Sequence, residues 1–291
     1  MKLLFPYFYM LYSAFCFSIM AVCGSVIGTN LLWITVAFFR IAPTFIFVGI
    51  IALIRKEKIL VLNSLSLWLR SILGTIALHC TFYSLSRMNA TDAVTISATT
   101  PIWVTLIMYI VFSDKVPSLF WVFVISTFLG IYLIEKPQFR GDFIPIFVAF
   151  LGAICAGSAM VSLSFCGFIT PITVVSHYSA VALMTTFCIF YLSKSDMPVF
   201  TEILEKYGVL LVVIGLSGTL GQIFLTYAYG TGKPQWISVT GLSQVVFTSL
   251  LEIILNRLRL NLELILGIVI VLSSIACVIM LRHDKNLAET T

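Results

Sequence analysis

Charged residues are scarce in this sequence. Asp, Glu, Lys and Arg make up only 10% of the 291 residues, whereas 60% are hydrophobic and the mean hydropathy is +1.10. A soluble chain of this length would form about two domains and would need far more polar surface to cover them. Apolar runs of about twenty residues are typical of membrane spans instead. The composition therefore predicts a polytopic membrane protein, with the lipid bilayer as its partner.

Several motifs that carry chemistry are also missing. The chain has no G-x-x-x-x-G-K-[ST] loop for ATP, no C-x-x-C pair and no H-x-x-x-H pair. Its seven cysteines lie in or beside apolar runs, where they are expected to be free thiols. The net charge of +5 comes from scattered Lys and Arg with no basic block, so nucleic acid is not an expected partner. We therefore expect no enzyme activity, metal or cofactor.

The apolar runs are predicted to be helices. In hydrocarbon the backbone must satisfy its own hydrogen bonds, and the period-2 alternation of a membrane barrel is absent. The first run is longer than the core of a signal peptide and lacks a clean cleavage site, so we expect a retained span. Breaks at charges, Pro and Gly give ten segments long enough to cross the bilayer: 4–23, 31–54, 67–86, 90–112, 118–135, 143–163, 172–192, 208–229, 235–256 and 262–281.

The loop charges predict the orientation of these spans. An even number of spans places both termini on one side of the membrane, and cytoplasmic loops carry an excess of Lys and Arg. In the first half, the basic residues counted on the side of the N-terminus are Lys2, Arg55, Lys56, Lys58, Arg70 and Lys115. The opposite side has Arg87, Lys136 and Arg140. The second half is nearly balanced, so the first half predicts cytoplasmic termini.

An internal repeat is predicted when the sequence is aligned with itself at a shift of 144 residues. This shift lays LGTIALHCTFYSLSRMNATDAV over SGTLGQIFLTYAYGTGKPQWIS and pairs Gly74 with Gly218 and Tyr83 with Tyr227. Few of the aligned residues are identical, so the interpretation depends on the span boundaries of the two halves, which lie at matching positions after the shift. Because five spans are an odd number, the second copy would enter the membrane inverted. The fold class predicted is thus an all-α integral membrane protein, with ten transmembrane helices in two inverted five-helix repeats, 1–140 and 141–291.

A few polar side chains stand where polarity is costly. Arg40 lies near the middle of the second span, where insertion of an Arg costs about 2.5 to 3.5 kcal/mol. It needs a carboxylate, water or an anionic ligand, so a structural ion pair and a substrate-facing role both remain open. Gln222, Gln244 and His79 also fall within spans, and interhelical hydrogen bonds alone would explain them.

The stretch RMNATDAVTISATTP gathers polarity at the start of the fourth span. At 100° per residue Asp92, Thr95, Thr99 and Trp103 share one stripe of the helix. Asp92 suits the helix N-terminus and could be an acid at a cavity mouth. Two opposed aromatic faces could stack a planar ring or hold a cation, although ordinary packing would also explain them. The shift of 144 residues aligns the stripe with Trp236, Val239, Ser243 and Phe247.

Taken together, these features resemble the drug/metabolite transporter superfamily in its ten-span EamA-type branch. The resemblance rests on the ten spans, FFR in the second, ALHCTFYSLSRMNATDAV leading to Pro101, and YAYGTGKPQWISVTGLSQVVF. It implies a secondary transporter of the bacterial inner membrane with a central cavity shared by two repeats. Many members end the fourth and ninth spans in Gly-Glu, where this chain has Ser113-Asp114 and Asn256-Arg257, and Val245 replaces the ninth-span Pro.

A narrower resemblance, carried by RSILGT, TDAVTISATTP and EKP, is to the S-adenosylmethionine uptake transporters. It implies alternating-access uptake of that small molecule, with exchange for S-adenosylhomocysteine as one mode. Arg40 would then bind the carboxylate, aromatic rings the adenine, and Asp92 the sulfonium. The full set of candidate substrate-binding residues is Arg40, His79, Tyr83, Asp92, Thr95, Thr99, Trp103, Gln222, Tyr227, Trp236, Gln244 and Phe247.

Other functions stay open at this point. An exporter of amino acids or related metabolites would have the same architecture, since sequence does not give the direction of transport. A channel or membrane scaffold is a more remote alternative, because neither pore-lining rings nor a large extramembrane face is evident. Whether the protein is a monomer or a homodimer is also open.

Overall fold

The computed structural model describes residues 4–27, 31–139, 142–193 and 200–290. All regular elements in these residues are helices, and ten of the spans they form are long and apolar enough to cross a membrane. The predicted all-α fold class is therefore confirmed. The uninterrupted spans are α1 (Phe5–Ile27), α2 (Trp33–Ile54), α3 (Leu65–Arg87), α6 (Ser118–Glu135), α7 (Phe143–Ser164), α8 (Pro171–Ser193), α9 (Phe200–Thr231) and α12 (Leu262–Thr290).

The fourth and ninth spans are each broken into two helices. The fourth consists of α4 (Ala90–Ser97) and α5 (Thr100–Phe112), and the ninth of α10 (Pro234–Gly241) and α11 (Ser243–Ile254). In the fourth span, Pro101 has no N–H to donate to the carbonyl of Ser97. The hydroxyl of Thr100 donates to that carbonyl instead, at 2.7 Å. The ninth span breaks without a proline, since Val245 occupies the corresponding place.

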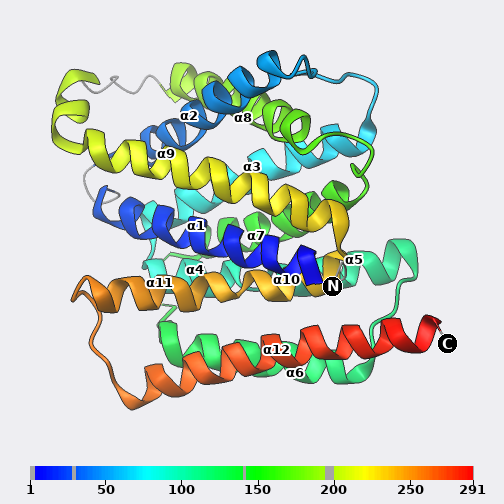
Figure 1. Cartoon of the computed structure of the whole chain (residues 1–291). Coiled ribbons are helices and arrows are strands. Elements are labelled where there is room, and N and C mark those ends of the chain that lie inside the picture. Colours follow the sequence, from blue (N-terminus) through cyan, green and yellow to red (C-terminus); the bar gives the residue numbers. More distant parts are fainter. Residues whose placement is uncertain (1–3, 28–30, 140–141, 194–199, 291) are drawn as a thin grey trace.

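Long antiparallel pairs build the bundle. Helix α1 packs along α9, α3 along α7, α2 along α8 and α6 along α12. Figure 1 shows the α2–α8 pair and the α6–α12 pair at opposite edges, with α1 between α9 and the α10–α11 span. Helix α1 begins and α12 ends at the same end of the bundle. This end is called the N-face below, and the other end the opposite face.

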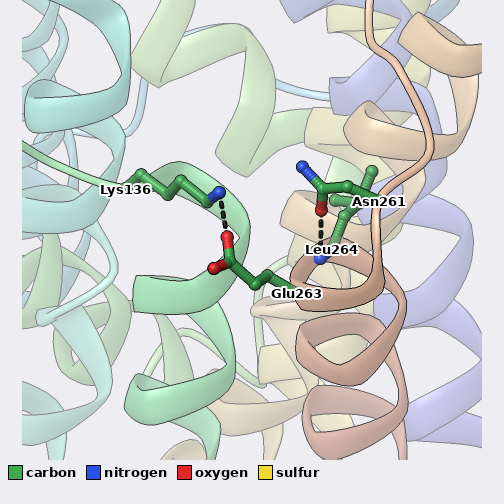
Figure 2. Close-up of polar contacts among 4 residues, drawn as sticks. All are labelled: Lys136, Asn261, Glu263 and Leu264. Atoms are coloured by element: carbon green, nitrogen blue, oxygen red, sulfur yellow. Dashed lines mark hydrogen bonds and ion pairs between the residues drawn. The ribbon is translucent and has the colours of Figure 1, made fainter.

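Short polar contacts join the loops at each face. At the N-face, Lys233 pairs with Asp114 at 3.5 Å. At the opposite face, Lys136 after α6 pairs with Glu263 at the start of α12, where the side chain of Asn261 accepts the N–H of Leu264 at 2.8 Å (Figure 2). Exposed ion pairs of this kind contribute about 0 to 1 kcal/mol. The loops are therefore joined, but the apolar spans hold the fold.

The outer surface of the bundle is apolar. Large side chains such as Leu53, Leu129, Met184 and Val209 are exposed on four different helices. In water such a surface would promote aggregation, whereas in lipid it is the ordinary exterior of a helical membrane protein. The exposed surface thus agrees with the membrane setting that the composition predicts.

Candidate substrate-binding site

Arg40 is buried within the bundle. It lies eight residues into α2 and is 6% exposed. Its guanidinium carbon is 5.7 Å from the centre of the Phe17 ring of α1, and its methylene stem lies beside Gly218 of α9. Within the described residues Nη1 has no hydrogen-bond partner. Three helices therefore hold a cation at membrane depth with one donor nitrogen, Nη1, unsatisfied.

Arg70 is a second buried cation, although we predicted that it lies in a loop. We counted Arg70 among the loop residues, but α3 already begins at Leu65, after Ser64, whose side chain accepts the N–H of Leu67. Arg70 is only 2% exposed, and its guanidinium carbon lies 4.5 Å from the centre of the Tyr178 ring of α8. Its Nε has no hydrogen-bond partner among the residues described. The loop assignment of Arg70 is thus wrong.

A glycine leaves room for the guanidinium of Arg70. Gly74 follows Arg70 by one helical turn, and a Cβ atom built there would overlap Nη1 of Arg70. The same Cβ would lie 3.2 Å from Cε2 of Tyr178. The side chain of Arg70 is therefore folded back along α3, away from the N-face, between Gly74 and the aromatic ring.

Neither buried arginine has an acidic partner in the described part of the chain. The ion pairs found there are Lys136–Glu263 and Lys233–Asp114, both at loops. Every carboxylate within the described spans lies within three residues of a span end. Arg70 instead faces the ring of Tyr178, which packs in one apolar cluster with Ile41, the residue after Arg40. An aromatic ring carries no formal charge, so no described partner compensates either cation.

A buried serine and histidine adjoin Arg70 and Tyr178 in sequence. The Ser71 hydroxyl and Nδ1 of His177 are 2.8 Å apart and join α3 to α8. His177 is fully buried, and the Trp68 ring meets it edge-on with centroids 4.7 Å apart. This interhelical bond fixes the register in which Arg70 meets Tyr178.

His79 and Tyr83 lie together on α3. The Trp33 ring of α2 meets both edge-on, with centroid distances of 6.1 Å to each. Nε2 of His79 is 3.1 Å from the Thr186 hydroxyl of α8, so the interhelical hydrogen bond that would explain His79 is present. Tyr83 lies nearer the opposite face, where the Arg87 guanidinium approaches its ring at 6.0 Å.

The polar stripe of the fourth span is divided by the helix break. Thr95 lies in α4 and donates to the carbonyl of Thr91, while Thr99 stands between α4 and α5. Trp103 keeps its contact with Thr99, because its indole N–H donates to that hydroxyl at 3.1 Å. Asp92 is fully buried and accepts the backbone N–H of Gln138 at 2.7 Å. Asp92 therefore anchors the α6–α7 connection at the opposite face.

The remaining candidates lie in separate places. Gln222 is buried beside Gly221, which packs against the Phe17 ring under Arg40, and Gln244 is half-buried in α11. Among the ring contacts found in the described residues, none joins two of the proposed aromatic residues. The ring partners are Tyr9 for Tyr227, Phe15 for Phe247, and Phe120 for Trp236, whose ring Arg282 also approaches at 5.8 Å.

The fold places this protein in the class of helical membrane proteins with ten spans. Comparison with known families narrows this class. Residues 4–135 match the EamA-like transporter family. This match supports, over the first half of the chain, the resemblance to the EamA-type branch. A solved structure superimposes on 94% of this chain and 96% of its own, with a TM-score of 0.75 at 13% identity, which shows that the fold is shared.

Three relatives are similar over most of the chain. A pseudopaline exporter of Pseudomonas aeruginosa is 26% identical over 186 residues, which cover 63% of each chain. An uncharacterised transporter of Helicobacter pylori is 25% identical over 217 residues, or 70% of each chain. The human solute carrier family 35 member G1 is 26% identical over 201 residues, 64% of this chain and 54% of its own. These names support transport and do not support the narrower resemblance to S-adenosylmethionine carriers.

Proposed function

We propose that this chain is a secondary transporter that carries a small carboxylate-bearing metabolite across the bacterial inner membrane by alternating access. The observation that carries the proposal is the buried, unpaired guanidinium of Arg40 at membrane depth. A charged group is retained there at a cost only if it has a task, and an arginine fork binds a carboxylate through two parallel hydrogen bonds. The carboxylate of the passing substrate is the partner we assign to it.

We also propose that 1–140 and 141–291 are inverted repeats with the substrate site between them. Helices α4 and α10 start 144 residues apart, at Ala90 and Pro234, and end 144 residues apart, at Ser97 and Gly241. The packing of α1 on α9 and α11 has its counterpart in that of α7 on α3 and α5. Broken helices in matching places of two halves are typical of transporter binding sites. From the loop charges of the first half we also propose that both termini lie in the cytoplasm.

S-adenosylmethionine uptake is one specific version of the proposal. Its carboxylate would bind Arg40, and the half-buried rings of Trp103 or Phe247 would contact the adenine. Against this version, Asp92 already accepts the Gln138 N–H, and the Trp236 ring already faces Arg282. Export of an amino acid or a related metabolite is the second version, and the name of the Pseudomonas relative favours it. Both substrates carry a carboxylate.

Transport in proteoliposomes tests the proposal. Purified protein is reconstituted, and counterflow of labelled S-adenosylmethionine, methionine, threonine and glutamate is measured, with S-adenosylhomocysteine as competitor. We expect saturable counterflow of a carboxylate substrate, and its loss in Arg40→Gln. Arg87→Gln is the matched control, because Arg87 is exposed at the opposite face. Absence of saturable flux for every substrate, or full activity of Arg40→Gln, would contradict the proposed function.

Rescue in cells separates the two versions. Cells that lack their own S-adenosylmethionine synthase should grow on external S-adenosylmethionine if the chain imports it. Failure of rescue, with the protein shown in the membrane, rules out the uptake version and leaves the exporter.

A further inference from the structure

We propose that Arg70 joins Arg40 to form one anion site, and that the substrate is a small organic dianion with its two negative charges on oxygen atoms. This inference rests on the proposed transport function and narrows its substrate class. Arg70 was assigned no role from the sequence. Both side chains are more than nine-tenths buried, and each has a guanidinium nitrogen without a hydrogen-bond partner in the described chain.

The site is built by packing. The stem of Arg40 passes Gly218 of α9 and its guanidinium faces the Phe17 ring, while Arg70 is folded over Gly74 against the Tyr178 ring. A lysine or arginine that merely reaches the headgroups would extend toward its nearer membrane face. Arg70 instead turns away from the N-face, toward the depth of Arg40. Aromatic rings and glycines thus hold both cations inside the bundle.

Charge balance gives the substrate class. Ile41, the residue after Arg40, packs in one apolar cluster with Tyr178, the ring that Arg70 faces, so the two guanidinium groups stand in neighbouring parts of one interior. Like charges placed there repel each other, and each guanidinium also loses its hydration. One carboxylate offsets one of the two charges. Among the described residues Arg70 faces the uncharged ring of Tyr178, and neither arginine has an acidic partner. A substrate with two anionic groups offsets both cations, whereas S-adenosylmethionine, with one carboxylate and two cationic centres, adds positive charge.

The chemistry fits two kinds of dianion, a dicarboxylate and a phosphate monoester. Each offers planar or tetrahedral oxygens that two guanidinium forks can bind together. The shared requirement is two negative charges, and the choice between the two kinds is an outcome of the experiment.

Flux with matched substrates tests the inference. Full-length protein in proteoliposomes is given labelled succinate, glycerol 3-phosphate and, as a matched monoanion, monomethyl succinate. We expect flux of at least one dianion to exceed that of the monoanion by tenfold or more. Arg70→Gln should reduce dianion flux at least tenfold, Arg70→Lys should restore part of it, and Arg87→Gln should leave it unchanged. Activity with one dianion only identifies which kind is carried.

Thermal unfolding without substrate gives a second readout. If Arg70 is uncompensated, Arg70→Gln removes a buried unpaired charge and the Tm stays level or rises. A structural partner for Arg70 would make the Tm fall in the same variant. One outcome would overturn the inference while the proposed function holds. In that outcome no dianion is carried, and zwitterions or monocarboxylates show saturable flux that is equal in wild type and Arg70→Gln. Absence of saturable flux for every substrate tested, glycerol 3-phosphate included, would overturn both.

Discussion

A methyl group at Gly74 should disable transport without removing any charge. The Cβ of an alanine at this position would overlap Nη1 of Arg70 and press on Tyr178 at 3.2 Å. Ordinary van der Waals contact begins near 3.4 Å, so the guanidinium must move by more than about 1 Å, and a misplacement of this size can cost about 100-fold in rate. The moving atom is the end of a flexible side chain, so the helix itself is not forced to shift.

The assay is the initial rate of counterflow in proteoliposomes with equal amounts of Gly74→Ala and wild type. Gly49→Ala is the matched control, because a Cβ on Gly49, in the buried part of α2, would meet nothing within 4 Å. Both substitutions should favour the helix by about 0.8 to 1 kcal/mol, so both proteins should fold. We expect Gly49→Ala to transport like wild type and Gly74→Ala to lose most of its rate. Equal rates in all three would refute the role given to Arg70.

Three further changes have distinct expected results. Arg40→Gln should lower transport efficiency by about 10- to 150-fold, because it removes a charged hydrogen bond worth about 1.5 to 3 kcal/mol. Arg87→Gln should leave the efficiency unchanged. Initial rates at low substrate concentration measure both effects. Asp92→Ala should lower the Tm, because it removes the oxygen that accepts the Gln138 N–H at 2.7 Å, while flux per folded molecule stays near wild type. A large loss of flux at unchanged Tm would restore Asp92 as a cavity acid. Gly130→Val should reduce the yield of folded protein in detergent, because a Cβ there would lie 2.9 Å from a backbone carbonyl of α12. A normal yield with an unchanged Tm would contradict the close packing of α6 on α12.

Hydropathy was sufficient to predict the spans, because lipid requires apolar runs of a fixed length and backbone hydrogen bonds within each run. The break in the ninth span was not predicted. Its counterpart in the fourth span has Pro101, but Val245 gives no such signal. At the break the N–H of Leu242 donates to the carbonyl of Val239, and the N–H of Val245 to that of Leu242, each three residues back. The depth of Arg70 was also missed. The predicted span 67–86 contains Arg70 near its start, but packing around Gly74 decides whether the side chain reaches the membrane face or folds back along the helix.

The grouping of side chains across helices was beyond the sequence. A 100° stripe predicts which residues share a face of one helix, and the contact between Trp103 and Thr99 follows from it. It does not predict which helix that face meets. Trp236 packs on Phe120 and Phe247 on Phe15, because the bundle brings α10 to α6 and α11 to α1 at these rings. The residues that share one face of a helix were therefore predictable, whereas the partner across each interface was not.

The most direct test of the central claim is counterflow of a labelled carboxylate metabolite in proteoliposomes, measured for wild type, Arg40→Lys and Arg40→Gln. If Arg40 binds the carboxylate of a transported substrate, wild type gives saturable counterflow, Arg40→Lys keeps part of it and Arg40→Gln loses it while remaining folded. Saturable counterflow of equal rate in wild type and Arg40→Gln would contradict the claim.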